Sequence, residues 1–570
     1  MPITLVFQFS LATFCLLDSS NILYFKYIHN NILWYTFRLK INYILLLFPL
    51  ISISIAYLLI NRKFTTIILS VLTLIASYPI FGIKVSLSLF AILLSVTPLK
   101  TRFLEDTLLW LLVTSSFIEG ISLLYWILIP SDNASMLKWF SDFEFSLYGV
   151  AALLAPQITI LALFIWAFKP AIESRIESFM KQRSSKTKLS AEGDEVHLKP
   201  DSLLMLSIII AVFGALYPYI PSVNQASGSF GSDVKSYVKT MELIGDDLSS
   251  AFNVSGGSRP LIYLAIYAFQ TIFRLDTLEA VKLMPLLLNP MLCASVYFMV
   301  SRASGDREWA GLASLFTSLG FNITVGMYAY YLTNILGLIL VFLATGFLFD
   351  DMANKKSIPL AASIMASLAI FTHPWTFAQF YVSLGALGAF FGYKWIKGDR
   401  SEPLYTMLVF LLVTGLVDVL KGRLLGGFGG VGSVASTFPT QFNFPFFWES
   451  NKYTFRALYG GLLSNSLMIL LSGAGIYLLK NKKPYELFLK ILVILSSIYY
   501  LFSHGMFGVG GYNYNPSRVL YNVPFGVFAA MSLMTLIRTN SLKKRTRITA
   551  ILSVTLSMAV YLFRSLANLI

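Results

Sequence analysis

The chain has 570 residues, of which 56% are hydrophobic and only 12% are charged. Soluble domains carry about 25% charged residues, so this composition excludes a globule whose whole surface faces water. The formal net charge of +15 could suggest nucleic acid, but the basic residues cluster in short segments between apolar runs, as in cytoplasmic loops of membrane proteins. We therefore expect a lipid bilayer as partner and no nucleic acid.

Apolar runs long enough to cross a bilayer, about 20 residues each, recur along the sequence. A transmembrane β-barrel would instead show segments of about ten residues with alternating polarity. We predict an all-α fold, a polytopic transmembrane helical bundle. Cys15 and Cys293 both lie inside apolar runs, so we expect no disulfide and no metal cluster. The first residues lack a basic region and a clear cleavage site, so no cleaved signal peptide is expected.

The N-terminal part is predicted to be a separate module. Residues 1–40 mix short apolar stretches with aromatic and basic residues, which fits either one helix or an interfacial segment. Longer apolar runs predict helices near residues 41–60, 64–83, 85–99, 108–129 and 146–168. We take residues 1–168 as an N-terminal transmembrane helical module and the basic segment 169–201 as a cytoplasmic linker.

Residues 202–570 carry a second series of apolar runs, which we take as the core of the protein. These runs predict helices near residues 202–221, 278–300, 309–325, 331–349, 358–372, 376–393, 404–420, 457–479, 486–502, 518–537 and 548–567. All the basic loops of this part fall on the cytoplasmic side of the membrane if residues 259–273 do not cross it. We therefore predict that this stretch lies along the outer surface or re-enters. Three outer loops follow, at residues 222–277, 421–456 and 503–517.

The first outer loop holds three acids close together, Asp233, Asp246 and Asp247. Residues after Asp233 could form a helix lying on the membrane, with Asp233 as its N-terminal cap. The functional alternative is a general base or a metal ligand at the mouth of a cavity. Asp246 and Asp247 could equally cap the next short helix.

Two further polar residues interrupt or border apolar runs on the predicted outer side. His373 precedes Pro374 within a long apolar stretch, and it is either a turn residue or a functional one, because polar groups at membrane depth are costly. Arg518 opens an apolar helix at its outer end. It could extend to the interface or bind a phosphate in a bidentate way. His504 shares its loop.

Three short sequence features lie within residues 202–570. Asp233 follows the first core helix, Arg259-Pro260-Leu261-Ile-Tyr leads into an apolar helix, and Asn-Pro-Ser-Arg518-Val-Leu-Tyr precedes an aromatic-rich helix. Together they resemble the GT-C superfamily of polytopic membrane glycosyltransferases, in which a Pro-Pro-Leu-Tyr-Tyr-type step is often seen. The resemblance implies a GT-C-like core with external loops that bear short juxtamembrane helices.

The resemblance also implies an enzyme of the hexosyl- or pentosyltransferase kind. Such an enzyme moves a sugar from a polyprenyl-phosphate-linked donor to a lipid, glycan or protein acceptor on the outer face of the cell membrane. By this resemblance Asp233 is the base or metal ligand and Arg518 contacts the donor phosphate. We take Asp233 and His373 as catalytic candidates. The substrate-binding candidates are Arg259, Asp246, Asp247, His504 and Arg518.

One departure from the family pattern concerns a divalent metal, Mg²⁺ or Mn²⁺. Many GT-C members have another acid in the second outer loop, which here reads Gly326-Met-Tyr-Ala-Tyr-Tyr and has none. Asp246 or Asp247 could substitute for it. Whether the site holds a metal therefore stays open at this point.

The main alternative function is a transporter, or a flippase or polymerase for lipid-linked oligosaccharides. A transporter would need polar groups through the midplane and, in many cases, an internal repeat. Glu119 and Asp418 are the few charged candidates, and no clear repeat is present. A purely structural membrane subunit is a third possibility.

Overall fold

The computed structural model describes two strands at residues 23–37, scattered positions between 109 and 127, residues 159–164, and most of residues 196–567. The gaps in that last range are residues 221–230, 258, 356–357, 400–402, 426–465, 481–482, 501–518 and 540–541. The chain divides into two compact units. One comprises Met1–Ile121, Asn133–Glu195 and Thr539–Val554, and the other comprises Ser122–Asp132, Val196–Arg538 and Thr555–Ile570. The predicted boundaries at 168 and 201 stay predictions, since most of residues 1–195 lies outside the described part.

Helices make up nearly all of the described structure, and seven of them are long and apolar enough to cross a membrane. This finding confirms the predicted fold class, an all-α bundle of a multi-pass membrane protein. The seven are Pro200–Tyr219, Thr277–Ser304, Arg307–Ala329, Leu332–Ala353, Leu404–Leu424, Val519–Ile537 and Lys544–Leu566.

A small antiparallel hairpin is the exception to the helical fold. Strand β1 (Leu23–Ile28) pairs with β2 (Ile32–Phe37), so that Leu23 lies opposite Phe37. One helix or an interfacial segment was expected within residues 1–40, and at residues 23–28 and 32–37 the chain forms strands instead of helix. The physical reason lies in the sequences LYFKYI and ILWYTF, which are dominated by aromatic and β-branched residues that favour strands.

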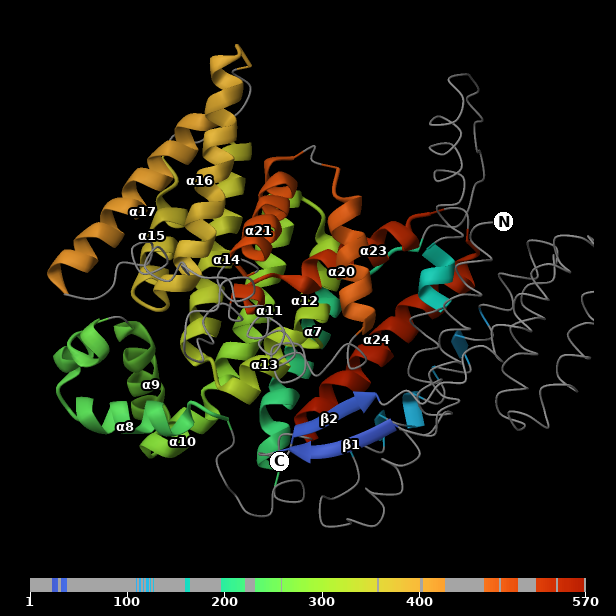
Figure 1. The fold of residues 1–570 in the computed structure, drawn as a ribbon, viewed down its shortest axis with the longest axis horizontal. Coiled ribbons are helices and arrows are strands. Elements are labelled where there is room, and N and C mark those ends of the chain that lie inside the picture. Colours follow the sequence, from blue (N-terminus) through green and yellow to red (C-terminus); the bar gives the residue numbers. More distant parts are fainter. Residues whose placement is uncertain are drawn as a thin grey trace, which may run out of the picture. The chain divides into compact units, whose positions relative to one another are not determined.

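The second unit is built around α11 (Pro285–Ser304), which packs against α7 (Pro200–Leu216), α12 (Arg307–Ser318) and α14 (Leu332–Ala353) (Figure 1). Short α13 (Phe321–Ala329) connects α12 to α14. Gly346 of α14 permits a close approach to α11, because a Cβ at this position would lie 2.9 Å from the ring of Phe298. Small residues at such crossings let membrane helices approach each other.

Two further groups of helices cover this centre. On one side α15 (Leu360–Ile370), α16 (Pro374–Ile396) and α17 (Leu404–Leu424) pack on one another and on α14, and α21 (Pro484–Tyr500) packs on α16. On another side α20 (Ser466–Leu478) packs on α23 (Phe525–Ile537), which packs on α12. The C-terminal part of α24 (Lys544–Ala567) reaches α13 through a hydrogen bond of 2.9 Å between the Tyr561 and Thr324 hydroxyls.

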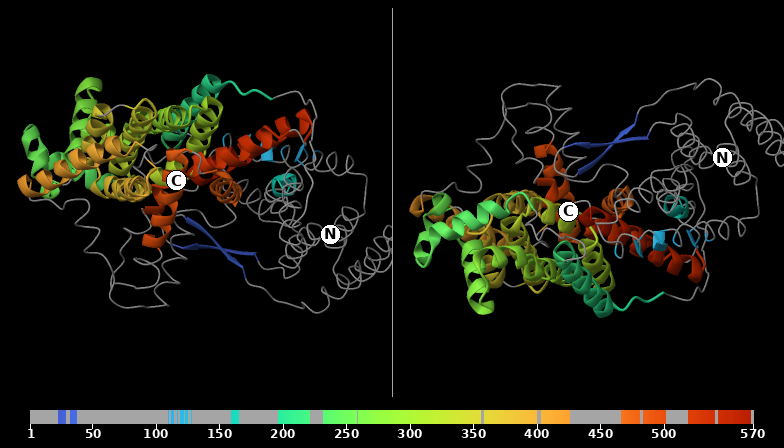
Figure 2. Two further views of the ribbon diagram at one scale, coloured as in Figure 1. Left: turned by 90° about the horizontal axis from the view of Figure 1, so that it is seen from above. Right: turned by 90° about the horizontal axis from the view of Figure 1, so that it is seen from below.

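Short helices gather at one end of the bundle, as Figure 1 shows. They are α8 (Val234–Ile244), the 3-10 turns η2 (Leu248–Phe252) and η3 (Val254–Gly257), α9 (Pro260–Phe273) and α10 (Thr277–Leu283). Both views in Figure 2 keep these green segments beside the end of α17, in agreement with Gly257, where an added Cβ would lie 3.0 Å from Leu425. We call this the α8 end of the bundle.

Helix α9 is too short to cross a bilayer. Its 14 residues extend over about 21 Å, against roughly 30 Å of hydrocarbon. Its last residues, Ile272 and Phe273, are 72% and 60% exposed although they are apolar. These properties fit a segment that lies along the membrane surface or re-enters, as the charge pattern requires.

The opposite end, which we call the basic end, is held together by ionic contacts. Arg538 pairs with Asp306 at 2.6 Å and with Glu308 at 3.0 Å, and Glu308 accepts a hydrogen bond from the Leu198 amide. Burial would raise the pKa of Asp306, but the hydrogen bonds and charge of Arg538 outweigh it and lower that pKa. Lys483 also donates to the Ser304 carbonyl. Segments that the charge pattern places on one side of the membrane thus lie together.

Which end faces the cytoplasm can be tested by cysteine labelling. Lys239 on α8 and Lys397 after α16 are both exposed. In a background without Cys15 and Cys293, we expect a membrane-impermeant maleimide added to intact cells to modify Lys239→Cys. Lys397→Cys should react only after permeabilisation. The reverse pattern would invert the predicted orientation.

Candidate functional site

Asp233 is held in place by the chain that precedes it. Gly231 has φ +103°, and a Cβ there would lie 2.6 Å from the Tyr330 ring. Ser232 then donates twice to the end of α13, from its amide to the Tyr328 carbonyl at 3.2 Å and from its hydroxyl to the Ala329 carbonyl at 2.9 Å. Only glycine fits the first position, so the approach to Asp233 is fixed by backbone contacts.

The Asp233 carboxylate does not cap the helix that it precedes. It occupies the N-cap position of α8, but no side-chain capping hydrogen bond is formed there. The Ser232 hydroxyl is 3.4 Å from its Oδ1. By contrast, Asp247 Oδ1 accepts from the Ser249 amide at 3.0 Å and from its hydroxyl at 2.7 Å. Asp247 therefore caps η2, and both Asp246 and Asp247 are exposed.

Tyr237, one turn further along α8, is near both Asp233 and Arg259. Burial raises the pKa of the Tyr237 hydroxyl; hydrogen bonds with Thr333 and the charge of Arg259 oppose this rise, and the Asp233 carboxylate adds to it. The hydroxyl donates to Thr333 Oγ1 at 3.3 Å and accepts from the Thr333 amide at 3.2 Å. Because its pKa stays raised, the Tyr237 hydroxyl remains a neutral donor near an acid and a cation.

Arg259 lies where α9 begins, beside the end of α15. The Leu261 amide donates to the Phe371 carbonyl at 3.3 Å, which fixes this junction. Lys421 reaches the same place from α17. Its Nζ donates to the Ile370 carbonyl at 2.6 Å and lies 5.4 Å from the centre of the Phe371 ring.

Lys421 is 3% exposed, and the charges of Asp418 and Arg259 both act on it. The second outer loop was expected to begin at Lys421, but α17 continues to Leu424 and holds this lysine inside the bundle. A buried charge in a membrane helix is expensive unless it is paired. Arg259, Asp418 and Lys421 therefore form a charged cluster at the α8 end.

His373 is 2% exposed and caps α16. Its Nδ1 accepts from the Thr376 amide at 3.2 Å and lies 2.8 Å from the Thr376 hydroxyl, which also donates to Asn334 Oδ1 at 3.1 Å. A nitrogen that accepts from an amide carries no proton, so in the neutral ring the proton is on Nε2. Any proton transfer by this ring would therefore use Nε2.

A chain of polar side chains continues from Asn334 through the apolar interior. Asn334 Nδ2 donates to Asn522 Oδ1 at 3.0 Å, and Asn522 Nδ2 donates to Gln379 Oε1 at 2.8 Å. Gln379 Nε2 in turn donates to the Ser496 hydroxyl at 2.6 Å and to the Val519 carbonyl at 3.0 Å. We call His373, Thr376, Asn334, Asn522, Gln379 and Ser496 the polar chain.

The polar chain fixes the segment that begins at Val519. Tyr521 strengthens this attachment, because its hydroxyl donates to the Asn322 carbonyl at 2.9 Å while Asn322 Nδ2 donates to the Tyr521 carbonyl at 3.0 Å. Arg518 and His504 lie outside the described residues. A small cavity of about 80 Å³, lined in part by Trp375, Gln379 and Val519, adjoins the polar chain.

The first turn of α14 connects the two catalytic candidates. Thr333 binds Tyr237, near Asp233 and Arg259, and its neighbour Asn334 binds the Thr376 hydroxyl beside His373. Sequence reasoning missed most of these connecting residues. The available signal was the presence of amides inside apolar runs, which is unusual in membrane helices unless they are paired or functional.

No group of three or more histidine, cysteine, aspartate or glutamate residues suited to a metal occurs within the part of the chain that the structure describes. Metal dependence thus stays open. No family model, no curated protein and no solved structure matches this chain. Any functional conclusion therefore rests on the residues and their geometry.

Replacing Asn334 tests whether the polar chain holds the bundle together. Asn334→Ala removes bonds to Thr376 and Asn522 and leaves buried polar atoms unpaired. We expect the free energy of unfolding to fall by roughly 1–3 kcal/mol, measured as a lower melting temperature in detergent. Asn354→Ala is the matched control, because Asn354 follows the same helix but is exposed. Equal melting temperatures for the two variants would contradict this role.

Proposed function

We propose that the protein is a membrane glycosyltransferase that moves a sugar from a polyprenyl-phosphate-linked donor to an acceptor at the α8 end, on the outer face of the membrane. The observation that carries the proposal is the position of Asp233. Its half-buried carboxylate precedes α8 without capping it. The charges of Asp233 and Arg259 both act on Tyr237, so a cation lies near this acid. An acid without a capping role and a nearby cation are what glycosyl transfer to a hydroxyl requires.

In the proposed reaction Asp233 acts as the general base. It takes the proton of the acceptor hydroxyl while the acceptor oxygen forms a bond to the anomeric carbon of the sugar. The bond from that carbon to the phosphate oxygen breaks, and its electron pair leaves with the polyprenyl phosphate. Cations stabilise the charge on this leaving group. Arg518 is the expected phosphate contact, and Arg259 is a second cation at this end.

His373 has a more limited place in this proposal than the sequence suggested. Its Nδ1 is occupied by capping α16, and the ring is buried. We assign it the task of fixing the start of α16, with Nε2 as the atom that would contact a phosphate or hydroxyl. Asp246 and Asp247 are less suited to bind substrate than Asp233, because the first is exposed and the second caps η2.

One observation favours transport of a lipid-linked sugar as the second candidate. The polar chain runs through the bundle interior and involves α14, α16 and α21, and a transporter needs polar groups inside its helices. The two functions differ in chemistry: a transferase releases free polyprenyl phosphate, and a transporter leaves the donor intact.

The variant Asp233→Asn tests whether Asp233 has a catalytic or a structural role. The amide keeps the size of the side chain but cannot accept the proton, so we expect transfer to fall by roughly two to four orders of magnitude. Purified protein would be incubated with polyprenyl-phosphate-linked hexoses and pentoses, and released polyprenyl phosphate would be measured by mass spectrometry. The melting temperature should stay nearly unchanged, because no capping bond is lost.

Asp246→Asn is the matched control, since Asp246 is an exposed acid in the same loop. It should retain activity close to that of the unmodified protein. If Asp233→Asn is as active as this control, Asp233 is not the base. If neither the unmodified protein nor Asp246→Asn consumes any donor, while vesicles that contain the protein show donor movement, the transferase proposal fails. Transport then takes its place.

Arg518→Ala tests the phosphate contact. We expect weaker donor binding at unchanged melting temperature, and only partial rescue by Arg518→Lys, because lysine lacks the bidentate geometry of a guanidinium. Donor affinity can be measured by titration with a polyprenyl phosphate. An affinity equal to that of the unmodified protein would show that Arg518 has no part in donor binding.

A further inference from the structure

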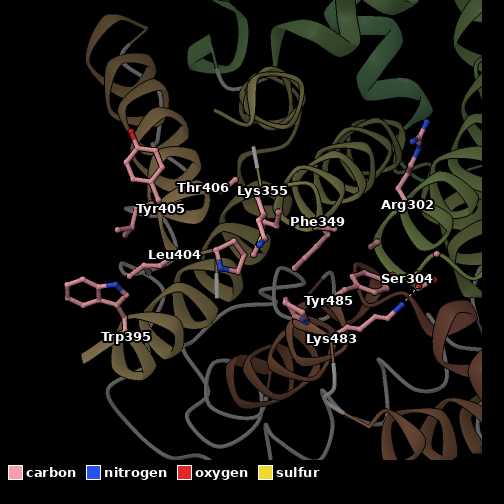
Figure 3. Close-up of a pocket in the computed structure, with 17 residues that line it drawn as sticks. Arg302, Ser304, Phe349, Lys355, Trp395, Leu404, Tyr405, Thr406, Lys483 and Tyr485 are labelled. Atoms are coloured by element: carbon pink, nitrogen blue, oxygen red, sulfur yellow. Dashed lines mark hydrogen bonds between the residues drawn. The ribbon is translucent and has the colours of Figure 1, made fainter. Parts of the chain in front are cut away.

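A cavity of about 1050 Å³ lies at the basic end of the bundle. Its walls come from the C-terminal ends of α11 and α14 and from the N-terminal ends of α17 and α21, with Trp395 of α16 beside them (Figure 3). Ligand pockets commonly measure about 300–1,000 Å³. The space is therefore large enough for a small molecule or for the head group of a lipid.

The described lining of this cavity is positively charged. Among the lining residues that the structure describes, three are cationic, Arg302, Lys355 and Lys483, and none is acidic. Arg302 has a distant ion pair with Asp350 at 3.8 Å, and Lys483 donates to the Ser304 carbonyl. Figure 3 shows Lys355 directed into the space between Leu404 and Phe349. Such a set of cations favours an anionic ligand with several acceptor oxygens.

Backbone geometry adds to this preference. α17 begins beside the cavity at Leu404, and no side chain caps its N-terminus, where Pro403 stands in the N-cap position. α21 begins beside it at Pro484. The N-terminus of a helix carries a partial positive charge and unpaired amide groups, which suit phosphate oxygens.

Tyr485 forms part of the inner wall of the cavity. It lines the cavity, and its ring packs between Phe349 and Trp309, with ring centres 5.5 Å and 6.1 Å away. Its hydroxyl is buried and has no hydrogen-bond partner within the described residues. A hydroxyl enclosed to this degree is not reached from the cavity, so Tyr485 contributes only to its wall.

One wall of the cavity is apolar and continues along the exposed face of α17. Trp395, Tyr405 and Leu408 line it and are 48%, 64% and 51% exposed. The exposed apolar face of α17 continues with Leu412 at 70% and Leu416 at 55%. Tryptophan and tyrosine favour the membrane interface. A head group in the cavity would thus leave its acyl chains against α17.

From these features we infer a binding site for a phosphate group at the basic end, with an anionic phospholipid as the source of that phosphate. The site lies on other helix ends than Asp233 and does not depend on the proposed transfer reaction. Lys355, Lys483 and Arg302 bind the phosphate oxygens, and the α17 face receives the acyl chains. A soluble phosphate compound shares the head-group chemistry but not the contact with α17.

Binding can be measured with the purified full-length protein in neutral detergent. The probes are dioctanoyl phosphatidic acid, dioctanoylglycerol without a phosphate, and inorganic phosphate, and the readouts are the dissociation constant and the ligand-induced rise in melting temperature. We expect the phosphatidic acid to bind, dioctanoylglycerol not to bind, and inorganic phosphate to bind more weakly. Equal affinity for inorganic phosphate and the lipid would overturn the lipid source and leave a soluble phosphate compound as ligand.

Charge-neutral variants test the site itself. Lys355→Gln and Lys483→Gln should each weaken lipid binding roughly tenfold or more. Lys355 is exposed and outside every helix, so its variant should fold normally. Lys397→Gln is the matched control, because Lys397 is an exposed cation at the same end that does not line the cavity. Equal weakening by Lys355→Gln and Lys397→Gln would reduce the effect to general surface charge and overturn the site.

Discussion

The first turn of α14 is the point on which the α8 end of the bundle depends. A helix that starts in apolar surroundings exposes amide groups that are costly to leave unpaired. The residue before α14, Tyr331, provides no side-chain cap. The Tyr237 hydroxyl of α8 accepts from the Thr333 amide instead, and Asn334 joins α14 to Thr376 of α16 and to Asn522. One helix start thus attaches three other segments through bonds that it needs for its own stability.

This arrangement explains why a short polar helix can be fixed beside a membrane bundle. α8 buries Val234, Tyr237, Met241 and Ile244 on one face, and burial of that apolar face alone would allow several orientations. The directional bonds between Tyr237 and Thr333 select one of them. The contacts of Ser232 with the end of α13 fix the other side of Asp233. The backbone before Asp233 is thus held by Ser232, while the Asp233 carboxylate forms no capping bond to α8.

Much of the fold could be predicted from hydrophobicity because lipid demands long apolar helices. Helix ends near 404 and 537 follow directly from this requirement. The expected helix near 309–325 is instead divided into α12 and α13 at Gly320, where a Cβ would lie 2.7 Å from the Phe316 carbonyl. The hairpin of β1 and β2 was missed because short aromatic runs also fit an interfacial helix.

The candidate site was harder to predict, because its bonds join residues far apart in the chain. Asn334 and Asn522 are separated by 188 positions, and no local pattern reports that contact. The same limit applies to the acids. Sequence alone could not tell which of Asp233 and Asp247 caps a helix, since both precede short helices, and only the position of the neighbouring Ser249 amide decides it.

Lys421 shows how a fold can keep a cation on the less basic side of a membrane protein. It binds the carbonyl of Ile370, the last residue of α15, and a helix C-terminus carries a partial negative charge that favours a cation. Asp418, one turn earlier on α17, adds a full negative charge, while Arg259 repels the lysine. The α15 terminus and Asp418 therefore compensate Lys421, and the charge of Arg259 acts on both Lys421 and Tyr237. Because Arg259 is half-buried and Lys421 is buried, an anionic group that approached this end from solvent would reach Arg259 first.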